Sequence, residues 1–151
     1  MKLRLPHLAL LMLFVAPAMT RADEGGQKGE QSSELGDSME KMNGAFRKLR
    51  RQVADPAQNE SSLALVAKMR STVVESAKYL PDKISKLPAE AQAEAKASYA
   101  DKMKELLATT DELAEALKAG KNEQAVKIIE ELHLQEEAGH KAFRPKKQKK
   151  D

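Results

Sequence analysis

The chain has 151 residues, of which 32% are charged and only 3% aromatic, and it contains no Cys and no Trp. The absence of Cys excludes disulfides, thiolate metal sites, a cysteine nucleophile and the covalent tether of a c-type haem. The length suits one domain. Because Ala, Leu, Glu and Lys dominate over β-branched and aromatic residues, the composition predicts an all-α protein.

Residues 1–22 have the pattern of a secretory signal peptide. A positive segment with Lys2 and Arg4 precedes an apolar run over residues 8–15, and small residues follow, with cleavage preferred after Ala22. The apolar run is shorter than the roughly 20 residues that a membrane-spanning helix needs. We therefore expect export with removal of this segment, the alternative being an uncleaved N-terminal anchor.

Removal of the signal peptide changes the charge of the chain. The signal holds three of the 26 basic residues and none of the 23 acidic ones, so the formal charge of +3 falls to zero. Residues 144–151 carry five basic residues and one acidic residue, which leaves residues 23–143 acidic. An acidic body with few aromatic side chains has neither a basic groove nor a base-stacking surface, which argues against nucleic-acid binding.

The remaining chain divides into a leader, a helical region and a tail. Residues 23–33 are polar and glycine-rich, which predicts a disordered leader, and residues 145–151 form a basic tail. Between them, apolar residues recur at the three- and four-residue spacing of a helix face, with a linker over residues 81–87. Four helices are predicted, over residues 34–54, 61–78, 88–118 and 122–143.

Helix boundaries follow from capping residues and helix breakers. Pro56 is expected to end the first helix, Ser61 or Ser62 to cap the second, Gly120 to terminate the third and Asn122 to cap the fourth. Short connections favour antiparallel neighbours, so the predicted fold is an antiparallel up-down-up-down four-helix bundle.

Motifs of hydrolases and nucleotide-binding enzymes are missing from the sequence. It contains no nucleophile elbow, no Walker loop, no HExxH and no glycine-rich dinucleotide fingerprint. Adjacent acid pairs such as Glu130-Glu131 are explained by a solvated helix face. The protein is therefore not expected to be an enzyme.

Met39 and His140 occupy corresponding positions in the predicted bundle. Met39 lies near the start of the first helix and His140 near the end of the last, and these helices are antiparallel neighbours. A thioether and an imidazole at one level suit the axial ligation of haem iron. Spacing alone favours the alternative, a core Met and a surface His, because Met fills cores for its own reasons. His133 lies too far from His140 along the helix to share a metal ion with it.

Two segments resemble a known family. Residues 34–43 (ELGDSMEKMN) and residues 132–144 (LHLQEEAGHKAFR) resemble the first and last helices of the cytochrome b562 family, and the resemblance extends over residues 34–144. It implies a soluble periplasmic bundle that binds haem b without a covalent bond, through Met39 and His140. It also implies one-electron transfer with a redox partner protein that the sequence does not identify.

Further site residues are carried over from the family by position. Tyr99 falls where the family has a haem-contacting aromatic residue, and Met103 falls where it has a second one. Arg144 matches an Arg close to the haem edge, which implies pairing with a haem propionate. Two departures imply a looser pocket: Glu136 stands in place of an Arg, and Gly139 in place of an aromatic residue.

A second hypothesis is a haem-free periplasmic helical bundle that acts as an interaction or stress-response protein. The high surface charge, the altered pocket residues and the lysine-rich tail are compatible with it. Such a protein would tolerate the loss of both Met39 and His140. The tail would then be a solvated end, or, in the electron carrier, a docking segment for an acidic partner.

Overall fold

The computed structural model describes residues 24–144, with side chains described for residues 34–144. Every regular element in this part is helical, which confirms the all-α class. The predicted signal peptide and basic tail lie outside the described residues. The elements are α1 (Glu24–Gln52), the 3₁₀ turn η1 (Pro56–Gln58), α2 (Asn59–Ser76), α3 (Asp82–Ser85), α4 (Ala89–Lys118) and α5 (Asn122–Phe143).

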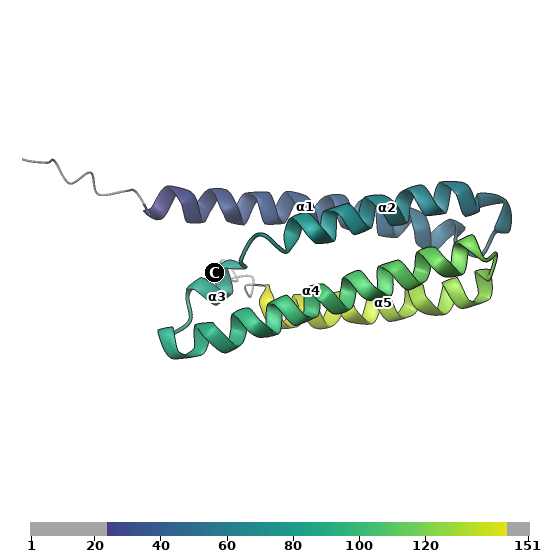
Figure 1. Ribbon diagram of the computed structural model, residues 1–151. Helices are drawn as coiled ribbons and strands as arrows, with labels where there is room; N and C mark the ends of the chain where they lie inside the picture. The colour runs from purple at the N-terminus through teal and green to yellow at the C-terminus, as the bar shows by residue number, and fades with distance from the viewer. Residues whose placement is uncertain (1–23, 145–151) are drawn as a thin grey trace, which may run out of the picture.

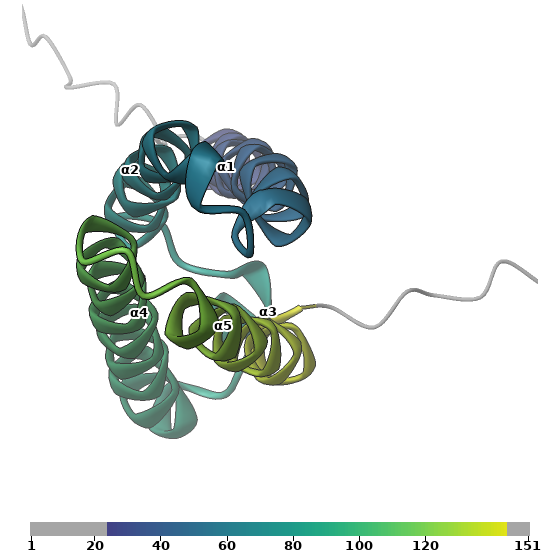
Figure 2. The same cartoon turned by 90° about the vertical axis from the view of Figure 1, so that its right-hand side faces the viewer.

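The four long helices lie along a common axis, and successive long helices run in opposite directions (Figure 1). Viewed along that axis, they form an arc in the order α1, α2, α4, α5 (Figure 2). Each helix packs extensively on the next in this order, whereas α1 and α5 pack on each other much less. The arc therefore has a seam between its first and last helices.

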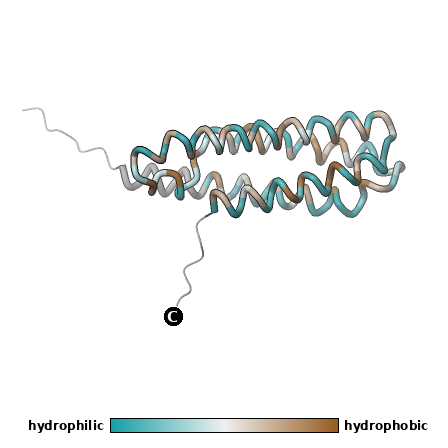
Figure 3. Tube along the Cα trace, turned by 90° about the horizontal axis from the view of Figure 1, so that it is seen from below, coloured by the Kyte–Doolittle hydropathy of each residue, from teal (hydrophilic) through white to brown (hydrophobic). Residues whose placement is uncertain are grey.

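The core consists of the inward faces of the four long helices. Apolar positions recur at intervals along each helix (Figure 3), and the buried ones form a single cluster. Removal of such surface from water is the main stabilising contribution to the fold. On α5 the buried residues lie in the first half of the helix, up to Leu132. The cluster includes Met42, Phe46, Leu49, Val53, Val66, Met69, Val73, Leu113, Leu117, Ile128, Ile129 and Leu132.

Several predicted helix boundaries are wrong. α1 begins at Glu24, so the helix includes most of the segment expected to be a disordered leader, residues 23–33. α2 begins at Asn59, which places Ser61 and Ser62 inside its first turn rather than at its cap. The side-chain cap in this region belongs to η1, which precedes α2: the carboxylate of Asp55 accepts a hydrogen bond from the Ala57 amide at 3.0 Å.

The predicted break after α4 is confirmed. Gly120 has a φ of +66°, a left-handed conformation that glycine adopts without a steric penalty. The Lys121 amide donates to the Ala116 carbonyl at 2.9 Å and the Gly120 amide to the Leu117 carbonyl at 3.1 Å. This pair of bonds is the Schellman motif, which satisfies the last carbonyls of the helix.

Asn122 has a different role from the predicted cap. It is the first residue of α5, and its buried side chain makes no capping bond. Its amide instead donates to the Val53 carbonyl and to the Asn59 side chain, both at 2.7 Å. Asn122 thus ties the start of α5 to the end of α1 and the start of α2.

We expect Asn122→Ala to lower the free energy of unfolding by about 1–3 kcal/mol, because it leaves the Val53 carbonyl without this partner. Gln124→Ala, at an exposed position two residues further along α5, should change it by less than about 0.5 kcal/mol. Urea unfolding followed by circular dichroism measures both. Equal effects of the two substitutions would contradict a stabilising role for the Asn122 bonds.

The predicted linker over residues 81–87 contains the short helix α3. Pro81 precedes it, Asp82 occupies its first turn, and Ile84 is almost completely buried in the core cluster. The Lys83 ammonium donates to the Ala142 carbonyl at 2.5 Å, which joins α3 to the last turn of α5. This end of the molecule is therefore covered by α3.

Among the described residues, no helix combines the length and apolar character needed to cross a membrane.

Candidate functional site

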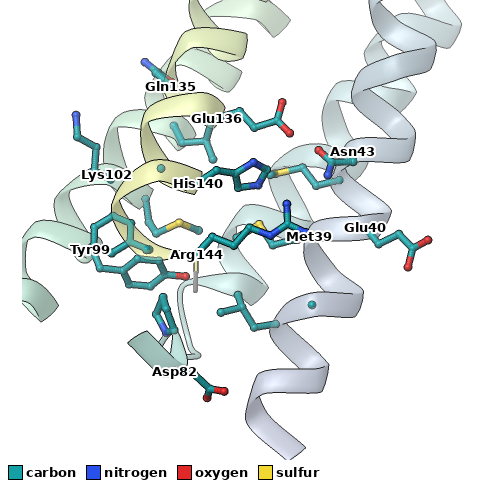
Figure 4. A pocket seen from close by; sticks show the side chains of 18 of the residues that line it. Met39, Glu40, Asn43, Asp82, Tyr99, Lys102, Gln135, Glu136, His140 and Arg144 are labelled. Atoms are coloured by element: carbon teal, nitrogen blue, oxygen red, sulfur yellow. The ribbon is translucent and has the colours of Figure 1, made fainter. Parts of the chain in front are cut away.

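A cavity of about 510 Å³ lies at the α3 end of the molecule. Its walls come from α1, α4 and α5, and residues at the start of α3 line it as well (Figure 4). The cavity thus occupies the seam where α1 and α5 pack least. Its volume is in the range of sites that bind small molecules and cofactors.

All five residues predicted to contact a cofactor line this cavity. Met39 is contributed by α1 and His140 by α5, and their side chains point into the space between the two helices (Figure 4). Both are partly buried. The helix arrangement therefore brings a thioether and an imidazole, about a hundred residues apart in sequence, to the same small volume. Tyr99, Met103 and Arg144 complete the set.

Tyr99 forms a fixed part of the wall. Its hydroxyl donates to the Ser76 carbonyl at 3.1 Å, and its ring meets the ring of Phe143 edge to face, with centroids 5.2 Å apart. Burial raises the pKa of the Tyr99 phenol to about 12. The ring thus links the end of α2 to α5 behind the cavity and presents an apolar surface to it.

The raised pKa of Tyr99 makes stability pH-dependent in alkali. In the unfolded chain the phenol loses its proton near pH 10, whereas in the folded protein it keeps it up to about pH 12. The folded state therefore binds more protons in this interval, and the free energy of unfolding falls as pH rises through it, by at most about 1.4 kcal/mol for each pH unit.

We expect Tyr99→Phe to remove this contribution, so that the variant loses less stability than the wild type between pH 10 and pH 12. Tyr79, whose pKa is also raised to about 12, by hydrogen bonds to Glu34 and Glu75 and by burial, is present in both proteins. Urea unfolding at several alkaline pH values gives the two slopes. Identical slopes would show that the Tyr99 phenol is not protected by folding.

Charged side chains of both signs surround the mouth of the cavity. Arg47, Lys102 and Arg144 are exposed cations among the lining residues, and Figure 4 shows Arg144 extending toward α1 beside Met39. The Arg144 amide donates to the His140 carbonyl at 3.0 Å, which places Arg144 one turn beyond His140. A ligand with an anionic edge would meet these cations at the surface.

Glu136 is a partly buried carboxylate in the wall of this site. Its side chain is only 19% exposed, and it lines the cavity one turn before His140. The nearest basic group recorded for it is the Nδ1 atom of His133, at 3.9 Å. Glu136 therefore contributes negative charge to the wall that carries His140.

His133 lies in the seam beyond the cavity, as expected for a residue between helices. Its ring stacks on Phe46 with centroids 6.3 Å apart, and the Arg50 guanidinium lies 5.8 Å from the Phe46 centroid. These contacts connect α1 and α5 at this level. Within the described range, no group of three or more His, Asp or Glu side chains is arranged to hold a metal ion.

Two features of the cavity were not predicted from the sequence. Pro81 and Asp82 line its α3 end, in a segment expected to be a linker. Gly36 on α1 also lines it, together with Gly139 on α5, whose place in the pocket was expected. A Cβ atom at either glycine would meet nothing within 4 Å. The sequence did contain a signal for Gly36. The apolar helix-face pattern extends back to residue 35, which places the first turn of the predicted helix at the end of the molecule where the cavity lies.

A comparison with protein families finds one match, to a family described as cytochrome b562, over residues 34–144. Neither a search of curated proteins nor a search of solved structures found a match. The matched range includes every residue that lines the cavity.

Proposed function

Because the chain belongs to the cytochrome b562 family, we propose that it is a b-type cytochrome whose haem is held without a covalent bond by Met39 and His140. Members of this family are haem-binding electron carriers and not enzymes. The observation that supports the two ligands is their placement on facing helices, at one cavity (Figure 4).

The residues around the cavity suit haem. A thioether and a neutral imidazole are the donor pair found in electron-transfer cytochromes. Met103, Leu106 and Phe143 provide apolar wall, while the bare helix backbones at Gly36 and Gly139 leave room for a flat ring. The exposed guanidinium of Arg144 is available to a propionate at the surface.

Bound haem would supply one-electron redox chemistry. Met39 and His140 would both hold the iron, so the chain would present no open position to a substrate. The fixed wall formed by Tyr99 and Phe143 excludes water from one side of the site. Ligands on α1 and α5 would also join the two helices that pack least, which completes an antiparallel up-down-up-down four-helix bundle.

We further propose that the protein acts in the periplasm. The support is the signal-peptide pattern of residues 1–22, with cleavage after Ala22. The redox partner is proposed to be another protein, and the lysines of the tail over residues 145–151 would steer an acidic partner by charge.

Haem titration of the purified protein tests the proposal. We expect saturable binding with the Soret absorbance of low-spin haem, and red protein when the chain is expressed with its own signal. Absence of any haem-dependent absorbance would favour the second hypothesis, a haem-free periplasmic interaction protein. The observation that favours that hypothesis is Glu136, because its carboxylate lies in the wall where an anionic cofactor would bind.

We expect Glu136→Gln to strengthen haem binding by up to about tenfold, which corresponds to about 1.4 kcal/mol, because it removes a negative charge near the propionates. Glu137→Gln, at a side chain that is 65% exposed, is the matched control and should change the affinity less than twofold, about 0.4 kcal/mol. Competition for haem with apomyoglobin measures both. The difference should shrink at high ionic strength, and weaker binding by Glu136→Gln would contradict the repulsion.

A further inference from the structure

More methionine side chains line the cavity than the single thioether ligand of the proposed haem site requires. Of the four methionines in the described part of the chain, three line the cavity: Met39 and Met42 from α1 and Met103 from α4. His140 faces them from α5, and Figure 4 shows sulfur atoms, in yellow, close to its ring. The fourth, Met69 on α2, does not line this cavity. The soft donors are thus gathered at one place.

We propose that this cavity binds a Cu(I) ion, through the three thioethers and the imidazole of His140, when it holds no haem. Thioether sulfur is a soft, uncharged ligand that selects Cu(I) among the metals available to proteins, and imidazole is a common copper ligand. This inference goes beyond the proposed electron-carrier function, because it concerns a second ligand of the cavity. Met39 and His140 belong to both donor sets, so haem and Cu(I) would exclude each other.

Burial and accessibility both support a metal site. Met42 and Met103 are only 7% exposed, so their sulfur atoms are largely shielded from competing water. Entry stays possible because the seam between α1 and α5 is lined there by Gly36 and Gly139, where a Cβ atom would meet nothing. Packing alone does not require methionine at these positions, since Leu and Met exchange in cores at a cost below about 1.5 kcal/mol.

The donor set disfavours other metals. Zn²⁺ in proteins is bound by thiolate, imidazole and carboxylate groups. The chain has no Cys, and the described residues contain no suitable cluster of three or more His, Asp or Glu. At the cavity, three uncharged thioethers accompany the imidazole of His140, and the lining carboxylates of Glu40, Asp82 and Glu136 form no such cluster with it. We therefore expect selectivity for Cu(I) over Zn²⁺.

The test measures Cu(I) affinity by competition with the coloured chelator bicinchoninate, without oxygen, with ascorbate as reductant and without added haem. The full chain should withdraw Cu(I) from the chelator, whereas Zn²⁺ should not bind. The double substitution Met42→Leu with Met103→Leu should weaken Cu(I) binding more than about tenfold, the loss that even an outer partner of a metal site causes. Met69→Leu, at a buried methionine that does not line the cavity, should leave Cu(I) affinity within about twofold.

Two results would overturn the proposal: no withdrawal of Cu(I) by the wild type, or equal affinity of the wild type and the double variant. Far-ultraviolet circular dichroism checks that the double variant is folded. Haem-saturated protein should lose Cu(I) uptake, and undiminished uptake would place the copper elsewhere and likewise overturn it. Haem titration of the wild type without copper reports separately on the electron-carrier function.

Discussion

His140→Ala is expected to weaken haem binding by more than about 100-fold and to abolish the low-spin Soret spectrum. His140 is the only histidine among the described residues that line the cavity, and loss of a group that merely supports a metal ligand already costs about 10–100-fold. Met39→Ala should also change the spectrum, with a smaller loss of affinity because the imidazole remains. Absorbance titration with haem measures both effects.

The matched control for His140→Ala is His133→Ala. Both histidines are on α5, but His133 stacks on Phe46 outside the cavity and is not among the lining residues. We expect His133→Ala to keep the wild-type spectrum and an affinity within about threefold, a difference below about 0.7 kcal/mol. If His140→Ala and Met39→Ala keep the wild-type spectrum, the proposed ligation is wrong, whatever the protein binds.

Leu49→Ala is expected to lower the free energy of unfolding by about 2–5 kcal/mol, the largest stability effect proposed here. Leu49 is completely buried in the core cluster between α1 and its neighbours, so the substitution removes apolar contacts and leaves a cavity. Because native domains are stable by only about 5–15 kcal/mol, this loss is a large share of the total. Urea unfolding with circular dichroism measures it.

Leu134→Ala makes the same chemical change on the surface. The Leu134 side chain on α5 is 64% exposed, so the substitution should change stability by less than about 0.5 kcal/mol. A similar loss for Leu49→Ala and Leu134→Ala would show that α1 is not packed as described. Neither residue lines the cavity, so haem affinity of the folded variants should be unchanged.

The periodicity of apolar residues predicted the long helices because each must bury one face. Leu49 on α1 and Val53, directly after its last residue, follow the expected spacing and are buried. Gly120 was predicted correctly for a local reason, since a left-handed residue after a helix favours glycine wherever it occurs. These signals are contained in a few consecutive residues and do not depend on the rest of the fold.

The predictions for Asn122 and for the linker were wrong because their partners are distant in sequence. Asn122 had the residue type of a cap, but the carbonyl of Val53 and the side chain of Asn59 compete for its amide. The linker became the helix α3 because Ile84 enters the core and Lys83 bonds to the last turn of α5. No local pattern contains these partners.

By itself, the sequence determined that the protein is helical, where most of its helices lie and which family it resembles, since these follow from local periodicity and short motifs. It also placed Met39 and His140 at the same level of the bundle, because the distance of a residue from the end of its helix follows from the number of residues between them. The resemblance also implied that Met103 and Glu136 lie at the pocket. Only the tertiary structure decided that Met42 lines the same cavity, that the Glu136 side chain is mostly buried in its wall and that α3 covers its end. The direction of a side chain in a bundle depends on the rotation of each helix about its axis, which packing between distant segments sets.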